Sequence, residues 1–167
     1  MSRLPVPTYV FALVVVRLGH RFLLVHERKH GQLYYLPAGR VEPGESIVAA
    51  AHRETLEEAG LPIDLAGILR IEHSALADGS ARMRVFFLAY PRDDTPPKSV
   101  PDAESLGAVW VSLDELSRYP LRGDEVSALF RHVAEGGPVY PLSLLCAEGA
   151  PWTRPGAGAG EKAGGRD

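Results

Sequence analysis

Cysteine is almost absent from the sequence, and its scarcity excludes one way of stabilising a fold. The chain of 167 residues has one cysteine, Cys146, so no disulfide can form within it. The lack of disulfides fits a reducing compartment, and we expect a cytoplasmic protein in which Cys146 is a small apolar filler of the interior.

Long hydrophobic segments are absent too. A helix that crosses a bilayer needs ~20 consecutive apolar residues, and no stretch of the chain approaches that length. The apolar run at residues 9–16 lacks a cleavage site and is typical of a buried strand rather than of a secretory signal. We therefore expect no association with a membrane.

Strong net charge is the third feature that the sequence lacks. The formal net charge is −3, with 46% hydrophobic and 23% charged residues, which is typical of one globular domain. A weakly negative chain has no long-range attraction for polyanions. These properties favour a small-molecule partner over a nucleic acid polymer, and they leave both a monomer and a homodimer open.

The chain divides into a domain and a tail. Residues 1–148 are predicted to form the single domain. From Gly149 the composition becomes rich in Gly, Ala and Pro with scattered charges. Residues 149–167 have too little apolar surface to offset the entropy of ordering, so we expect a flexible tail.

Within the domain, apolar patterning predicts strands alternating with helices. Residues 82–90 are expected to form a strand, which places Met83, Val85 and Phe87 on one face and Arg84 and Phe86 on the other. Further strands are expected at residues 9–16, 22–26, 33–36, 67–72 and 108–111, and helices at 45–59, from 112 and at 125–134.

The most informative stretch is residues 39–61, GRVEPGESIVAAAHRETLEEAGL. Pro43 and Gly44 break the chain and place a helix start near residues 45–46. No proline or glycine follows until Gly60, which suits a left-handed helix cap. The pattern therefore predicts one continuous helix.

Three glutamates lie on one side of this helix: Glu54, Glu57 and Glu58. Carboxylates so placed repel one another, and a divalent cation such as Mg²⁺ among their oxygens would remove that repulsion. The neighbouring Arg53 can pair with Glu45, two turns earlier. An acidic face exposed to solvent is the alternative interpretation.

The spacing of this stretch decides between the two interpretations. Gly39, Glu45 and the nonapeptide RETLEEAGL at residues 53–61 resemble the Nudix box of MutT-like Nudix hydrolases at every fixed polar and glycine position. Thr55 departs from the box, because the family usually has a bulky aliphatic residue there. The resemblance extends more weakly over residues 9–131, and it implies an α/β fold, the Nudix fold, with a mixed β-sheet sandwiched between helices.

The resemblance also implies a metal site and a reaction. It assigns the binding of Mg²⁺ or Mn²⁺ to Glu54, Glu57, Glu58 and the carbonyl of Gly39, and the reaction is hydrolysis of a nucleoside diphosphate linked to a further moiety. In the family, an acidic loop residue before a tryptophan strand adds a metal ligand or the general base. Glu104, six residues before Trp110, matches that place, with Asp102 as its rival. Glu54 and Glu104 both remain candidates for the base.

Four further side chains receive supporting roles. Arg28 matches a place where the family has a phosphate-binding basic residue, and Arg84 at the entry of an apolar strand is a second candidate for phosphate. Glu45 and Arg53 are expected to hold the helix against the Gly39 loop.

The substrate is less sharply defined than the reaction. Three segments, LPAGRVEPGE, DAESL and PLR, resemble the branch of the family that removes phosphate from oxidised guanine nucleoside diphosphates. General hydrolysis of nucleoside di- and triphosphates, and cleavage of ADP-ribose or nucleotide sugars, are the alternatives. A non-catalytic nucleotide-binding module is disfavoured because such modules usually lose a glutamate of the box.

Overall fold

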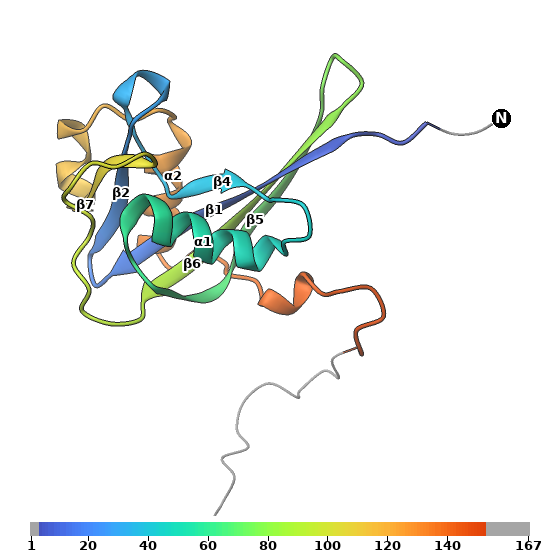
Figure 1. Ribbon diagram of the computed structural model, residues 1–167. Coiled ribbons are helices and arrows are strands. Elements are labelled where there is room, and N and C mark those ends of the chain that lie inside the picture. The colour runs from blue at the N-terminus through green and yellow to red at the C-terminus, as the bar shows by residue number, and fades with distance from the viewer. Residues whose placement is uncertain (1–3, 153–167) are drawn as a thin grey trace, which may run out of the picture.

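The computed structural model describes residues 4–152. The predicted tail at residues 149–167 thus lies mostly outside the described residues. Seven strands and two α-helices form the described chain (Figure 1). The strands are β1 (Thr8–Leu18), β2 (Arg21–Glu27), β3 (Tyr34–Tyr35), β4 (Ala38–Arg40), β5 (Ile63–Ala75), β6 (Ala81–Pro91) and β7 (Ser105–Ser112). The helices are α1 (Ile47–Ala59) and α2 (Glu125–Ala134), with 3₁₀ turns at His30–Gln32, Leu113–Arg118 and Leu142–Leu144.

The sheet is mixed and is built around β1. Its main order is β3-β2-β1-β6-β5, with β4 paired to β1 and β7 paired to β2. The pair β1–β6 is parallel, and the other strand pairs are antiparallel. The centre of β1 is buried on both faces, which explains why its sequence is a continuous apolar run rather than an alternation.

Helices cover both faces of the sheet, as the sequence predicts. On one face, Val85 and Phe87 of β6 join a core with Ala50 and Ala51 of α1. On the other face, Phe86 packs in a second core with residues of α2, among which are Val126, Phe130 and Val133. The predicted alternation of β6 between the two faces is therefore confirmed.

Helix α1 ends at the predicted residue, Ala59, and begins at Ile47, two residues after the predicted start. The hydroxyl of Ser46 accepts a hydrogen bond from the backbone N–H of Ala49, and Gly60 adopts the left-handed conformation with φ +71°. Thr55, the departure from the box, is fully buried. Its hydroxyl donates to the Ala51 carbonyl at 2.8 Å, so a polar side chain is accommodated without an unsatisfied group.

Two other expectations meet different outcomes. The four prolines of residues 91–101 predict a loop, and the structure confirms it: the chain is irregular from residue 92 to residue 104 and passes the end of α1, where the Lys98 N–H donates to the Ala59 carbonyl. Cys146 is exposed, so the expectation of a buried filler is wrong. It follows a 3₁₀ turn, where Leu142 and Leu145 supply the apolar contacts with the core. No helix in the described part of the chain is long and apolar enough to span a bilayer.

The contact between α2 and the sheet gives a test of this packing. Phe130 is fully buried, and its ring stacks on Phe22 with centroids 4.4 Å apart. We expect Phe130→Ala to lower the free energy of unfolding in urea by about 3–5 kcal/mol, because it leaves a cavity in the second core. Leu144→Ala serves as the control, since Leu144 is exposed. An equal loss in both variants would contradict the packing described here.

Candidate active site

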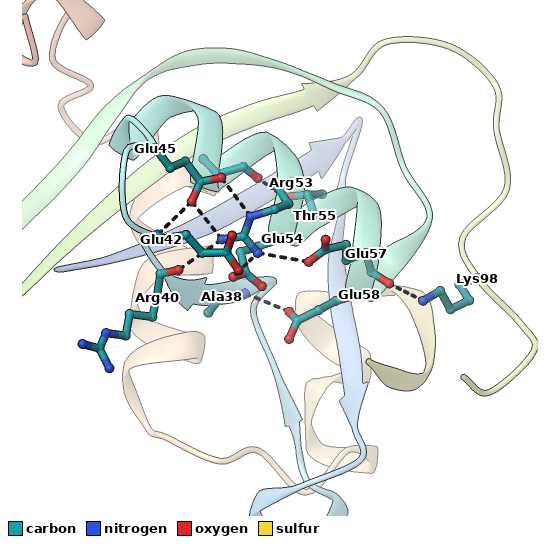
Figure 2. Close-up of polar contacts among 11 residues, drawn as sticks. Ala38, Arg40, Glu42, Glu45, Arg53, Glu54, Thr55, Glu57, Glu58 and Lys98 are labelled. Carbon is teal, nitrogen blue, oxygen red and sulfur yellow. Dashed lines mark hydrogen bonds and ion pairs between the residues drawn. The ribbon is translucent and has the colours of Figure 1, made fainter. Parts of the chain in front are cut away.

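Arg53 organises the polar groups of α1 and the loop before it (Figure 2). Its Nε lies 2.8 Å from Glu45 Oε1, and its Nη2 donates to the Arg40 carbonyl at 3.1 Å. Nη1 contacts Glu54 Oε1 at 2.7 Å and Glu57 Oε2 at 3.0 Å. The predicted pair of Arg53 and Glu45 is present, and the same guanidinium also gathers two of the three glutamates.

Gly39 lies against the carboxylate of Glu54. It belongs to β4, where it pairs with Ala12 of the central strand. A Cβ added at Gly39 would overlap the carboxylate of Glu54, so any larger residue must displace that side chain. The Glu54 carboxylate beside Gly39, with Glu57 and Glu58 on the same side of α1, provides the hard oxygen donors that Mg²⁺ and Mn²⁺ take. The residues present therefore fit a divalent cation.

Glu58 is the most buried of the three glutamates. One oxygen accepts a hydrogen bond from the Ala38 N–H at 2.9 Å. Burial raises the pKa of Glu58 to about 8, and the neighbouring Glu54 adds to that shift. Burial also raises the pKa of Glu54. Two carboxyl groups with raised pKa values side by side favour a bound cation, which would stabilise their ionised forms.

The carboxylates of Glu54, Glu57 and Glu58 do not converge on a single point in this structure. Over residues 4–152, no group of three acidic, histidine or cysteine side chains stands in a metal-holding arrangement. The hydrogen bonds explain this, because Arg53 holds Glu54 and Glu57 while the Ala38 N–H holds Glu58. A cation at Glu54 and Glu57 would share these carboxylates with Arg53.

Two hollows meet beside these carboxylates. One, of about 800 Å³, is lined by Glu54, Glu57 and Arg53 and is called here the carboxylate groove. The other, of about 500 Å³, is called the arginine pocket because six of its lining residues are arginine or lysine. These are Arg28, Lys29, Arg40, Arg82, Arg84 and Arg122. Arg40 and Glu104 line both hollows and so mark their junction.

The acidic loop places its two candidates differently. Glu104 is exposed and borders both hollows, as its predicted role requires. Asp102 instead builds the loop: it pairs with Lys98 at 2.6 Å and accepts the backbone N–H groups of Glu104 and Ser105. The hydrogen bond from Lys98, followed by those backbone bonds, lowers the pKa of Asp102 to about 2. Asp102 therefore acts as a structural anchor for Glu104.

Both predicted phosphate ligands line the arginine pocket, in different states of pairing. The Nε of Arg28 donates to the Asp102 carbonyl at 2.6 Å, which ties the loop after β2 to the acidic loop. Arg84 forms ion pairs with Glu72 at 2.6 Å and with Glu125 at 3.3 Å. The charge of Arg84 is thus already balanced by two carboxylates, whereas that of Arg28 is not balanced by its carbonyl partner.

Sequence reasoning missed a second polar cluster in the arginine pocket. Arg122 Nη1 donates a hydrogen bond to Glu27 Oε1 at 2.5 Å, and His30 Nδ1 lies 3.3 Å from the same oxygen. The guanidinium of Arg122 covers the ring of Tyr35 at 3.7 Å from its centroid. Burial raises the pKa of Glu27, and its other oxygen is buried with no hydrogen-bond partner among the described residues.

The sequence around Glu27 and Arg122 has no local pattern that would have assigned these residues to one cluster. Glu27 looks like part of a charged turn, although a register shift between His26 and Glu27 redirects its side chain in the structure. The segment before α2 pairs with β3, with Tyr34 opposite Leu121, and so brings Arg122 over the pocket. The hydrogen bond between Arg122 and Glu27 joins residues 95 positions apart in the sequence, and no local pattern reveals such a contact.

Comparison with known proteins agrees with this geometry. The model of the NUDIX domain matches residues 7–132. The chain belongs to the NUDIX hydrolase family. The matched residues span the sheet, α1, most of α2 and both hollows.

Named NUDIX relatives cover the chain to different extents. The human protein named 8-oxo-dGDP phosphatase NUDT18 is 37% identical over 147 residues, which cover 83% of this chain but only 44% of that protein. Phosphatase NudJ of Escherichia coli is 30% identical over 148 residues, covering 87% of this chain and 95% of NudJ. This chain therefore spans less than half of the human relative and nearly all of the bacterial one.

Solved structures support the NUDIX fold directly. A NUDIX hydrolase from Nitrosomonas europaea superposes with a TM-score of 0.67 at 29% identity, over 84% of this chain and 97% of that one. A MutT protein from Methanosarcina mazei, 24% identical with a TM-score of 0.59, shares the fold. The predicted mixed sheet between helices is thus confirmed.

The contact between Gly39 and Glu54 predicts a specific effect on metal binding. We expect Gly39→Ala to fold and to bind Mn²⁺ at least about tenfold more weakly in a titration followed by electron paramagnetic resonance. The matched control is Gly44→Ala. Gly44 has φ +81° and open space around it, so the substitution costs about 1 kcal/mol in stability but leaves Glu54 in place. Equal Mn²⁺ affinity in Gly39→Ala and wild type would refute the role of the Gly39–Glu54 contact in metal binding.

Burial of Glu58 predicts how stability depends on pH. Its pKa rises from 4.5 to about 8 on folding, so the folded protein holds this proton more tightly than the unfolded chain does. In a chelator, the free energy of unfolding should therefore fall as the pH rises from 4.5 toward 8. Urea unfolding across that range should show a shallower slope for Glu58→Gln. An unchanged slope would contradict the burial of this group.

Proposed function

We propose that the protein is a divalent-cation-dependent hydrolase that cleaves the phosphoanhydride of nucleoside di- or triphosphates, with oxidised guanine nucleotides as its substrate class. The observation that carries the proposal is the contact of Gly39 with the Glu54 carboxylate at the junction of the two hollows. Oxygen donors lie on one side of this junction, and cationic side chains for phosphate lie on the other.

The proposed cation is Mg²⁺ or Mn²⁺, held by the Gly39 carbonyl and by Glu54, Glu57 and Glu58. When bound, it would neutralise phosphate oxygens and lower the pKa of a coordinated water. Arg53, already in contact with Glu54 and Glu57, would keep these carboxylates aligned while Glu45 retains the guanidinium. The role of Glu45 and Arg53 is thus to position α1 and its side chains.

The roles proposed for the two arginines and for the general base follow from where these side chains lie and from how their charges are paired. Arg28 has only a carbonyl partner and is suited to bind a phosphate directly. Arg84, balanced by Glu72 and Glu125, is suited to form one wall of the nucleoside site with a smaller contribution to phosphate charge. Glu54 and Glu104 both border the carboxylate groove, so either can take a proton from the attacking water.

The choice of substrate class draws on the relatives. The human relative is named an 8-oxo-dGDP phosphatase, and the matched region covers 44% of it. In this chain, the half-buried Phe11 gives the arginine pocket apolar surface for a base. We further propose that residues 1–148 act as one domain on a small nucleotide, in the cytoplasm, as a monomer or a homodimer.

The proposal is tested by a substrate panel with Mg²⁺: dGTP, 8-oxo-dGTP, dGDP, 8-oxo-dGDP, ADP-ribose and a nucleotide sugar. Selective release of phosphate from 8-oxo-dGDP is expected. Faster turnover of ADP-ribose or of the sugar would replace the proposed substrate class. The absence of turnover on every compound, with Mg²⁺ bound, would contradict the hydrolase.

Removing one carboxylate separates catalysis from folding. We expect Glu57→Gln and Glu58→Gln to lower kcat by roughly 100-fold or more with the fold intact, because each removes a negative oxygen donor from the cation site. Glu148→Gln is the control, since Glu148 is exposed and lies beyond the residues assigned to the site. Near-normal rates for Glu57→Gln or Glu58→Gln would refute the assignment of these carboxylates to the cation.

A further inference from the structure

The outer floor of the arginine pocket is formed by one face of three neighbouring strands. Phe11 of β1 lies opposite Arg40 of β4 on one side and opposite Arg84 of β6 on the other. Two residues farther out, Tyr9 lies opposite Arg82. Because strand residues two apart share a face, Arg82 continues the row of Arg84 outward by ~7 Å.

The two outer arginines are not balanced by carboxylates. The guanidinium of Arg40 lies over the Tyr9 ring, 4.4 Å from its centroid, and Figure 2 shows it directed away from the glutamates. Among residues 4–152, neither Arg40 nor Arg82 has an acidic group within ion-pair distance, whereas Arg84 has two. Both are exposed, and both line the arginine pocket.

The Tyr9 ring lies beside two guanidinium groups that have no carboxylate partner within the part of the chain that the structure describes, those of Arg40 and Arg82. This arrangement is suited to a ligand that carries both a negative charge and a planar group. Arginine binds phosphate oxygens through paired N–H donors, and the half-open face of Tyr9 offers stacking surface. Tyr9 is 38% exposed although it lies in a strand, so its ring is available to a ligand. In the same pocket, Arg84 and Arg122 are already paired with glutamates, and the cationic residues Arg28 and Lys29 belong to a separate segment, the loop after β2.

The place of this site indicates which part of a nucleotide it meets. The 5′-phosphate chain must run toward Gly39 and the carboxylate groove if the proposed function holds. Arg82 stands on β6, two strands away from β4, at the outer end of the pocket that receives the nucleoside. With the 5′ chain directed toward β4, the group that we assign to Arg82 is one carried by the sugar.

We propose that Arg40, Tyr9 and Arg82 form a subsite for a second phosphate group, carried on the sugar of the nucleotide substrate. The inference rests on the proposed function for the location of the 5′ chain. It extends the substrate class from nucleoside 5′-diphosphates to 5′-diphosphates that also bear a 3′- or 2′-phosphate.

Binding without turnover tests the subsite. Guanosine 3′,5′-bisphosphate and guanosine 5′-monophosphate have no anhydride, so calorimetry with Mg²⁺ present measures affinity whether or not the protein is a hydrolase. We expect the bisphosphate to bind about tenfold more tightly, and this advantage to shrink as salt is raised. Equal affinity of the two nucleotides for the wild-type protein would overturn the proposal.

Variants locate the advantage on the protein. Arg82→Gln and Arg40→Gln should each reduce the ratio of the two affinities toward one. The matched control is Arg92→Gln, an exposed arginine at the far end of β6 that pairs with Asp64 and lines neither hollow. It should keep the wild-type ratio. A ratio that persists in the Arg40→Gln, Arg82→Gln double variant would overturn the assignment to these residues.

A third ligand identifies the source of the phosphate. The dinucleotide pGpG carries its 3′-phosphate as a diester to a second nucleoside. Tighter binding of the bisphosphate alone would assign the subsite to a phosphomonoester, and an equal gain for both would assign it to the phosphate that joins the first two nucleotides of a strand. Either result supports the phosphate subsite. Failure of the hydrolase panel together with a retained bisphosphate advantage would leave this inference standing and refute only the proposed reaction.

Discussion

The close approach of strand β4 to helix α1 is the constraint on which the rest of the site depends. Gly39 allows the backbone to touch the Glu54 carboxylate, and the Ala38 N–H holds Glu58 one helical turn away. Arg53 closes the same contact from the helix side by donating to the Arg40 carbonyl. Together these bonds fix the rotation of α1 about its axis, so its acidic side faces the junction of the two hollows.

That arrangement concentrates negative charge in a partly buried place. Burial raises the pKa values of Glu54 and Glu58, and two cations compensate in part: Arg53 beside Glu54, and the charge of Arg122 for Glu58. Since Arg53 also contacts Glu45 and Glu57, it links charge compensation to the position of the helix. The site therefore keeps an excess of negative charge. A divalent cation can compensate that charge, and the bound cation can then attract an anionic substrate.

The parts predictable from sequence were those specified by local patterns. Ser46 and Gly60 mark the ends of α1, and the alternation in β6 sorts its side chains between the two cores. The pairing of Glu45 with Arg53 was predicted as a contact within one helix, but Glu45 lies before the Ser46 cap, so the loop that precedes α1 brings it to Arg53. The cluster of Glu27 with Arg122 and the balancing of Arg84 by Glu125 were not predictable, because they depend on packing between distant segments. Cys146 was misassigned because burial of a single small residue has no periodic signature.

The most direct test of the account is anomalous diffraction from crystals soaked with Mn²⁺. A peak within coordination distance of the Gly39 carbonyl and the carboxylates of Glu54, Glu57 and Glu58 is expected. A peak at another acidic site, or no peak at saturating Mn²⁺, would contradict the claim that this helix face is built to hold a cation.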